Sequence, residues 1–423
     1  MSCRAGVFRG VVYVGVAFSI LAAVVGIVIR VVPVKMGGNC PESEKFPPPP
    51  LKSGPVPGGG VATLALMGNT SCAQLMDRSV WCWGDGRVLH AGVLEKPTQI
   101  FSASPRKNMV LGGFTRCDIT EENRARCTKG VGLPVGPPSD FILELPNVKH
   151  LVVGAHHACA IREREQEGLW CWGANDSKQI IDSSKAIATP TRVTFAPSGS
   201  TENVAVGDDF TCAQASGQNV ECWGSNRLGQ LGGGGQDLSI SHATVMQTES
   251  TVQLVAGNDH ACALSKDGRL RCWGANAFGQ LGDGTTENRS SPVEVKGLDG
   301  PTQQIVASSN QTCAVMATGM LYCWGETLDC PWESSCWSPR YQSMPPVRIP
   351  DLNNVVDLAL GEHHACALRR DGSVACWGEN SYRQVSDGMP FFKDEGYGNQ
   401  KYCGSYIRFL KKGATDHPVP VIW

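Results

Sequence analysis

Residues 252–292 have the sequence VQLVAGNDHACALSKDGRLRCWGANAFGQLGDGTTENRSSP, and this stretch decides the fold. His260–Leu264 and Leu270–Trp273 are two β-prone runs that face each other across a short polar turn. Counting inward from Cys262 and Cys272 leaves three loop residues, and the last of them is a glycine. A type I turn with a G1 bulge needs a left-handed residue at that position. The register places the two cysteines directly opposite each other, close enough for a disulfide.

The same hairpin recurs in seven units, and each unit carries its own cysteine pair. Six pairs have nine residues between the cysteines, and the third pair has eleven. The first cysteines of neighbouring units lie 42 to 53 residues apart, which is the length of one propeller blade. The sequence therefore predicts an all-β, seven-bladed β-propeller. The pairs are Cys72 with Cys82, Cys117 with Cys127, Cys159 with Cys171, Cys212 with Cys222, Cys262 with Cys272, Cys313 with Cys323, and Cys366 with Cys376.

Three roles are open to these cysteines. A buried free cysteine is a small apolar core residue. A zinc site needs more ligands than one pair supplies, and no second pair or matched set of histidines lies near each pair in the sequence. Opposed register in all seven pairs favours disulfides instead. Each bridge would close a loop of about eleven residues and stabilise the fold by about 2–3 kcal/mol in the chain-entropy model.

Gly257–Thr285 contains the pattern Gly-x-x-His-x-Cys-Ala-Leu, then Asp-Gly, then Cys-Trp-Gly-x-Asn-x-x-Gly-Gln-Leu-Gly-Asp-Gly-Thr. It resembles the repeat of the regulator-of-chromosome-condensation family, whose members fold as seven-bladed propellers. The resemblance covers about residues 61–423 and is weakest in the second unit, where Thr128-Lys129-Gly130 replaces Trp-Gly. The paired cysteines depart from the nuclear members and are similar to the disulfide-bearing extracellular versions, such as Crinkly-type receptor kinase ectodomains.

The N-terminal part predicts a membrane anchor. Val11–Ile29 is an uncharged, almost wholly apolar run of 19 residues, long enough to span a bilayer as a helix. We expect a short cytoplasmic segment at 1–10, a transmembrane helix at 11–34, a Pro/Gly-rich tether at 35–60 and the propeller at 61–423. A cleaved signal peptide is the alternative for the same segment. Flanking charge is nearly balanced, so the cysteine pairs, which need an oxidising space, orient the propeller to the extracytoplasmic side.

Composition and motifs exclude several classes of function. A formal net charge of −2 gives no basic footprint, so nucleic acid is not an expected partner. No nucleophile elbow, zinc-protease or phosphate-loop motif occurs, so we expect no catalysis, no cofactor and no metal site. A sugar-binding or enzymatic propeller would need carboxylates on one rim, and the sequence shows none that can be placed. His157, His260 and His364 precede the first cysteine by two residues and are expected to bond within their own blades rather than bind metal.

Two units depart from the repeat directly after Trp-Gly. The sixth replaces Gly-Gln-Leu-Gly with a loop that contains Cys330 and Cys336, an expected further disulfide, and the seventh carries an insertion at Met389–Lys412. Both segments should emerge on the same face of neighbouring blades and form an aromatic, partly basic ridge that binds a protein partner. The alternative is that they only cover the propeller seam. The predicted partner-binding residues are Trp332, Trp337, Phe391, Phe392, Tyr397 and Tyr402.

The predicted function is that of a membrane-tethered, extracytoplasmic, non-catalytic propeller that acts as a protein-binding module or scaffold subunit. The family resemblance includes a guanine-nucleotide exchange factor, whose cytosolic or nuclear GTPase a propeller outside the membrane could not meet. Secreted β-lactamase inhibitors also use this fold, so the alternative is a soluble inhibitor or ligand released by signal-peptide cleavage. The sequence leaves open how the ring closes, whether Cys40 pairs with Cys403, and whether its four Asn-x-Ser/Thr sequons are glycosylated.

Overall fold

The structure is a computed structural model, and everything it describes belongs to one compact unit, Pro47–Trp423. Among these residues no helix is long and apolar enough to span a membrane. The expected anchor at 11–34, and nearly all of the tether at 35–60, lie outside them. The described residues are 59–86, 93–101, 106–112, 115–127, 143–163, 167–194, 196–197, 199–234, 242–326, 345–350, 352–379, 382, 384–385 and 415–421.

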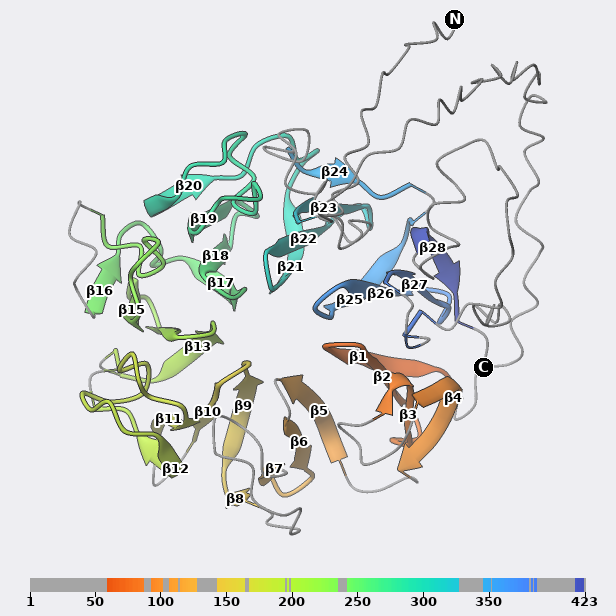
Figure 1. Cartoon of the computed structure of the whole chain (residues 1–423), viewed down its shortest axis with the longest axis horizontal. Helices are drawn as coiled ribbons and strands as arrows, with labels where there is room; N and C mark the ends of the chain where they lie inside the picture. The colour runs from red at the N-terminus through yellow and green to blue at the C-terminus, as the bar shows by residue number, and fades with distance from the viewer. Residues whose placement is uncertain are drawn as a thin grey trace, which may run out of the picture. The chain divides into compact units, whose positions relative to one another are not determined.

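Twenty-eight described strands form seven four-stranded antiparallel sheets, each made of four consecutive strands. Figure 1 shows the sheets as blades around one axis, with the first strand of each blade innermost. Blade one has β1 (Val61–Met67), β2 (Thr70–Leu75), β3 (Val80–Asp85) and β4 (Val93–Phe101). Blade two has β5 (Arg106–Gly112), β6 (Thr115–Thr120), β7 (Ala125–Cys127) and β8 (Leu143–Leu145). Blade three has β9 (Val148–Val153), β10 (His157–Arg162), β11 (Gly168–Gly173) and β12 (Ile187–Arg192).

The remaining four blades repeat this order. Blade four has β13 (Thr201–Val206), β14 (Phe210–Ala215), β15 (Val220–Gly224) and β16 (His242–Val245). Blade five has β17 (Thr251–Ala256), β18 (His260–Ser265), β19 (Leu270–Gly274) and β20 (Arg289–Glu294). Blade six has β21 (Thr302–Ser308), β22 (Gln311–Met316), β23 (Leu321–Gly325) and β24 (Val347–Arg348). Blade seven has β25 (Val355–Leu360), β26 (His364–Arg369), β27 (Val374–Gly378) and β28 (Thr415–Pro420).

The hairpin register that the sequence predicts is confirmed. Cys262 lies opposite Cys272, and the cysteines of the other six units lie opposite each other in the same way. Gly268 has φ 82° and Asn123 has φ 59°, the left-handed conformation that the turns require. The turn residue and the cysteine pair therefore agree on one register in the hairpin of blade five.

The predicted cysteine pairs are confirmed as disulfides in all seven blades. Each has a Cα–Cα distance of 4.1 Å, so the middle two strands of every blade are cross-linked. The expected eighth bridge, Cys330 with Cys336, lies outside the described residues. The seven bridges join Cys72 to Cys82, Cys117 to Cys127, Cys159 to Cys171, Cys212 to Cys222, Cys262 to Cys272, Cys313 to Cys323, and Cys366 to Cys376.

The hydrophobic core lies between the blades rather than within one of them. The tryptophan of each good Cys-Trp-Gly motif packs against the preceding blade, as Trp273 does against Phe210 and Leu231 of blade four. Trp83, Trp223 and Trp273 are fully buried. Replacing a tryptophan of this kind by alanine costs about 3–5 kcal/mol, because a large cavity remains. The tryptophans of the Cys-Trp-Gly motif therefore stabilise the interfaces between blades.

The ring closes without a shared strand, which settles a point that the sequence left open. Blade one contains only β1–β4 and blade seven only β25–β28, and β1 contacts β25 and β26 across the seam. Polar contacts hold that seam at its inner edge. The carboxylate oxygen Oδ2 of Asp357 accepts hydrogen bonds from Thr63 Oγ1 and from the backbone N–H of Leu64, both at 3.1 Å. Val61, Leu66, Leu368 and Val374 pack beside them in one apolar cluster.

The outermost strands have one unpaired edge each, and most of them contain proline. Pro97 lies in β4, Pro190 in β12 and Pro292 in β20, while β28 contains two prolines. A proline has no N–H to donate, so it is tolerated only where the strand faces solvent. The outermost position of these strands therefore explains how four blades accommodate proline within a sheet.

Candidate functional site

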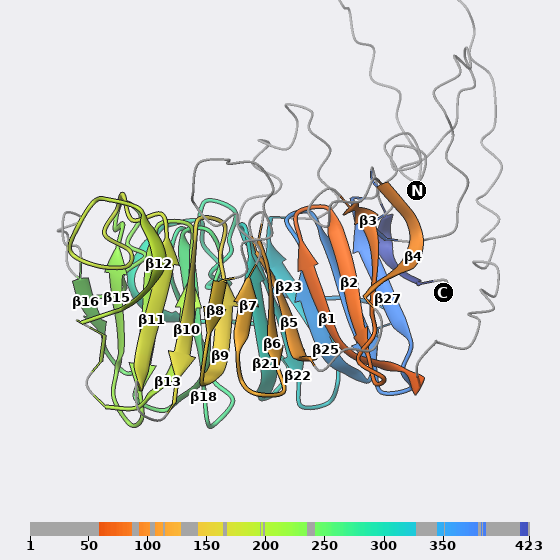
Figure 2. The same cartoon turned by 90° about the horizontal axis from the view of Figure 1, so that it is seen from below.

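One end of the ring carries the longest connections. In each blade the chain turns after the first and third strands at one end, which we call the loop face, and after the second at the other end, the turn face. Figure 2 shows the strands of all blades running between these two ends. The sixth and seventh units depart from the repeat after β23 and β27, which are third strands of neighbouring blades. The described chain therefore leaves both blades at the loop face.

The six residues predicted to bind a partner lie outside the described residues. They are Trp332, Trp337, Phe391, Phe392, Tyr397 and Tyr402, and their role stays a prediction. The structure describes the chain up to Glu326 in the sixth unit, and in the seventh unit up to Val385, ahead of the insertion at Met389–Lys412.

The glycine of the Gly-x-x-His motif makes room for the histidine ring. A Cβ atom on Gly361 would lie 2.5 Å from Nδ1 of His364, far inside van der Waals contact. A Cβ atom on Gly257 would lie 2.6 Å from Nδ1 of His260 in the same way. The ring thus folds back onto the loop after the first strand. Neither glycine therefore has room for a Cβ atom unless the histidine ring moves.

Each repeat histidine bonds to the next blade, which corrects the expectation of a bond within its own blade. Nε2 of His157 lies 2.7 Å from Oγ1 of Thr211 in blade four. Nε2 of His260 lies 2.9 Å from Oγ1 of Thr312 in blade six. The partner residue stands more than 50 positions away, directly before the first cysteine of the following unit. An inspection of one repeat unit alone therefore cannot reveal the contact, because its two residues belong to consecutive units.

The third histidine latches the seam between blade seven and blade one. Nε2 of His364 lies 2.7 Å from Oγ of Ser71. Ser71 Oγ in turn donates to the backbone carbonyl of Gln384 at 2.7 Å. The indole Nε1 of Trp83 donates to that same carbonyl, also at 2.7 Å. One carbonyl of blade seven thus receives two donors from blade one, so the closing seam uses the repeat's own contacts.

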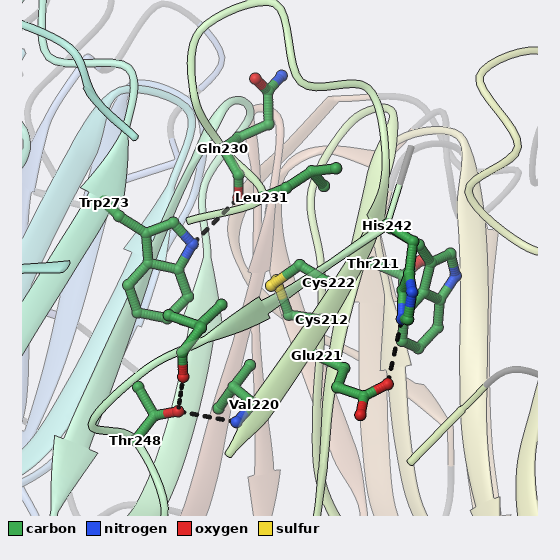
Figure 3. Close-up of a disulfide and its surroundings, with 12 residues drawn as sticks. Thr211, Cys212, Val220, Glu221, Cys222, Gln230, Leu231, His242, Thr248 and Trp273 are labelled. Carbon is green, nitrogen blue, oxygen red and sulfur yellow. Dashed lines mark hydrogen bonds and ion pairs between the residues drawn. A yellow bond between two sulfur atoms is a disulfide. The ribbon is translucent and has the colours of Figure 1, made fainter. Parts of the chain in front are cut away.

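The Gly-Gln-Leu motif supplies this carbonyl in other blades. Gln230 O accepts the indole Nε1 of Trp273 at 3.0 Å, as Figure 3 shows beside the Cys212–Cys222 disulfide. The glutamine side chain reaches the next blade as well, because its Nε2 donates to Oδ1 of Asp259 at 3.0 Å. The glutamine therefore ties the loop of one blade to the loop of the next and fixes the loop face as a rigid surface.

Carboxylates gather at the axis on the loop face. Asp208, Asp209, Asp259 and Glu362 follow first strands of blades four, five and seven, and they act on one another electrostatically. Burial raises the pKa of Asp208 to about 6, with a contribution from the other three carboxylates and an opposing one from His156. Burial and Asp209 also raise the pKa of Asp259.

Sequence reasoning placed no carboxylates on one rim, and this cluster corrects it. The sequence signal is an acidic residue between the glycine and the aromatic residue or histidine of the repeat. This position follows the first strand of a blade, so acidic residues there in different blades lie near the axis. In the part of the chain that the structure describes, no three His, Cys, Asp or Glu residues are arranged to hold a metal ion.

Comparisons with known proteins agree with this geometry. A family model described as the regulator of chromosome condensation (RCC1) repeat matches residues 252–280 and 355–384, and a second model of the same description matches 267–315. Prp20p from Saccharomyces cerevisiae aligns at 18% identity over 81% of this chain and 85% of that chain, with a TM-score of 0.64. Human WBSCR16 aligns at 19% identity over 71% of this chain and 83% of that chain, with a TM-score of 0.57.

A plant receptor ectodomain is also similar. The ectodomain of the receptor kinase CR4 from Physcomitrella patens aligns at 21% identity over 76% of this chain and 74% of that chain, with a TM-score of 0.46. At identities this low, the matches to Prp20p and WBSCR16 show a shared fold and nothing about a shared partner. The chain is thus a seven-bladed propeller with a disulfide in every blade, and the family models identify regulator of chromosome condensation repeats in residues 252–315 and 355–384.

Proposed function

We propose that this chain is an extracytoplasmic, non-catalytic protein-binding module that its N-terminal segment holds at a membrane. The observation that carries the proposal is the set of seven disulfides, one in each blade. Disulfides persist in oxidising compartments and are rare in the reducing cytosol. A propeller that depends on them has to fold outside the cytoplasm, and the apolar run Val11–Ile29 offers the route there.

The loop face is the surface that we assign to the partner. Both departures from the repeat leave the described chain there, after β23 and β27. They carry the aromatic residues that typically anchor interfaces, Trp332 and Trp337 in the sixth unit and Phe391, Phe392, Tyr397 and Tyr402 in the seventh. The rigid framework of disulfides and inter-blade hydrogen bonds lowers the entropy lost on binding.

Protein binding is also the role for which a similar propeller is described. Prp20p has been studied for its binding to Gsp1p and to histones, and its fold is the one seen here. The acidic loop-face residues and the net charge of −2 do not suit nucleic acid. The alternative function is a soluble inhibitor or ligand of another protein, which would require removal of the segment at 11–34.

The test of the binding face is a paired substitution. Trp332→Ala with Trp337→Ala should abolish capture of the protein that co-purifies stoichiometrically from native membranes, without lowering the thermal midpoint. The matched control is Met76→Ala with Met246→Ala, which removes two exposed side chains from the turn face and should leave capture intact. Capture that survives the tryptophan changes would reject the loop face as the binding surface.

The test of the tether is independent of the partner. An anchored protein should keep its N-terminal residues in mass spectrometry of the purified chain and should resist extraction by alkaline carbonate. A mature N-terminus between residues 26 and 38, with release into the soluble fraction, would instead support the secreted inhibitor or ligand.

A further inference from the structure

Three of the interfaces between blades share a contact that a histidine makes. His157, His260 and His364 each meet a hydroxyl of the next blade, so that the interfaces three–four, five–six and seven–one share one contact. The four–five interface is different, because Phe210 takes the histidine's place and packs in one apolar cluster with Ala261.

The two residues before the first cysteine differ between the units that supply the histidine and the units that supply the hydroxyl. Each histidine unit carries alanine directly before its first cysteine, and each receiving unit carries Thr or Ser there and no histidine two residues before the cysteine. The three alanines are Ala158, Ala261 and Ala365, and the three hydroxyl residues are Thr211, Thr312 and Ser71. The histidine and hydroxyl positions thus form a matched pair across the interface.

The hydrogen bonds require these rings to be neutral. Each hydroxyl has one proton and gives it to a glutamine carbonyl, as Thr211 does to Gln179 O at 2.7 Å and Thr312 to Gln280 O at 2.9 Å. The hydroxyl oxygen is then left to accept the Nε2–H of the histidine. Nδ1 of each ring is buried and has no hydrogen-bond partner. A second proton at Nδ1 would place a charge in a buried interface.

No described carboxylate acts on these rings to offset that cost. The charged groups that act on His157 and His364 are the neighbouring His156 and His363, which have the same sign. A backbone hydrogen bond with Asp208 partly offsets the lowering of the pKa of His157. A backbone hydrogen bond with Gly68 does the same for the pKa of His364. Burial alone acts on His260.

We propose that the three histidine–hydroxyl contacts make closure of the propeller ring sensitive to pH, because their protonation opens the interfaces three–four, five–six and seven–one while the four–five interface stays closed. The device lies in the fold and is independent of any partner. A propeller that passes from a neutral to an acidic compartment would loosen at three defined seams.

The direction of the effect follows from the pKa values. Burial lowers the pKa of His157 and His364 to about 3 and that of His260 to about 4, against 6.5 for an exposed histidine. A lowered pKa leaves the interface at full strength above pH 6.5 and weakens it as the pH falls toward the folded-state value. Each histidine then approaches about a tenfold change in the opening equilibrium per pH unit.

The carboxylates of the loop face act in the opposite direction. Asp208 binds its proton more tightly in the folded chain, because its pKa is raised to about 6. Its protonation therefore favours the closed ring between about pH 6 and pH 4, and Asp259 acts in the same sense. The five–six interface isolates the effect of the histidine, because burial alone lowers the pKa of His260.

Indole N–H exchange tests the proposal on the unmodified protein. Each interface has its own reporter, namely Trp223 for three–four, Trp324 for five–six, Trp83 for seven–one and Trp273 for four–five. Between pH 7.5 and pH 5.0 the protection factor of Trp324 should fall about 30-fold, and those of Trp223 and Trp83 should fall as well, with Trp223 falling less because Asp208 acts in the opposite direction. That of Trp273 should not fall, because the groups beside the four–five interface are Asp208 and Asp259, whose protonation favours the closed form. Equal loss at all four indoles, or at none, would overturn the proposal.

A pair of variants tests the assignment to the histidine itself. His260→Phe with Thr312→Ala copies the Phe210–Ala261 pairing into the five–six interface, so Trp324 should lose its pH dependence while Trp223 and Trp83 keep theirs. If the double variant fails to fold, titration of the His260 imidazole resonances in the natural protein decides, because a ring that protonates near pH 6.5 without opening would overturn the proposal.

Discussion

Reduction of the disulfides should unfold the propeller, and the size of the effect follows from the loop lengths. Six bridges join residues ten positions apart, and the third joins residues twelve apart. In the chain-entropy model each such loop contributes about 3 kcal/mol to the free energy of unfolding. Seven together contribute about 20 kcal/mol, which exceeds the net stability of about 5–15 kcal/mol that globular proteins have. The chain without its bridges should therefore not hold the fold.

The assay separates loss of the bridges from damage by denaturant. Protein unfolded in guanidinium with a phosphine reductant is diluted into buffer that keeps the reductant, and an oxidised sample follows the same steps without it. We expect native tryptophan fluorescence and far-ultraviolet circular dichroism only in the oxidised sample. Without denaturant the reductant should act slowly, because Cys262 and Cys272 are fully buried. A reduced sample that regains the native spectra would refute the reasoning.

A single bridge gives the scale of the effect. Replacing Cys262 and Cys272 by alanine should lower the free energy of unfolding by about 3 kcal/mol in urea titrations, and the fold should survive. The matched control replaces Cys159 and Cys171, whose slightly longer loop changes the expected loss by only about 0.2 kcal/mol. A difference of several kcal/mol between the two variants would show that packing of the sulfurs, rather than loop closure, dominates.

Two further substitutions test the seam contacts. Gly361→Ala places a Cβ atom 2.5 Å from Nδ1 of His364 and should destabilise the protein by about 1–3 kcal/mol in urea unfolding. Adding His364→Ala should recover part of that loss, and no recovery would contradict the clash. Asp357→Ala leaves the backbone N–H of Leu64 without its acceptor and should cost about 1–3 kcal/mol. Asp357→Asn keeps an acceptor oxygen and should cost less, so equal losses would contradict the assignment.

The sequence predicted what repeats within one unit. The opposed cysteines, the left-handed turn residue at Gly268 and the number of blades all depend on neighbours a few residues apart, and all three are confirmed. The partner of His260 was predicted wrongly, because Thr312 belongs to the next unit and the contact depends on how two blades pack. A comparison of the histidine position in one unit with the residue before the first cysteine of the next unit would have revealed the alternation of histidine and hydroxyl.

The carboxylates of the loop face were missed for a related reason. Asp208 and Glu362 lie more than 150 residues apart, and only closure of the ring brings them toward one axis. A repeat pattern in the sequence does not give the distance between residues on blades that are not neighbours. The departures from the repeat, in contrast, show in the sequence itself, which is why Trp332 and Trp337 were named from it.

The prolines of the outer strands limit edge-to-edge association between copies of the protein. A free β-edge is a template for strand addition, by which proteins at high local concentration join into continuous sheets or fibres. Pro97, Pro190 and Pro292 interrupt that template in three blades, and β28 does so in the seventh. At high local concentration, copies of the propeller can therefore touch at these four blades without strand addition, so contacts made there should remain separable.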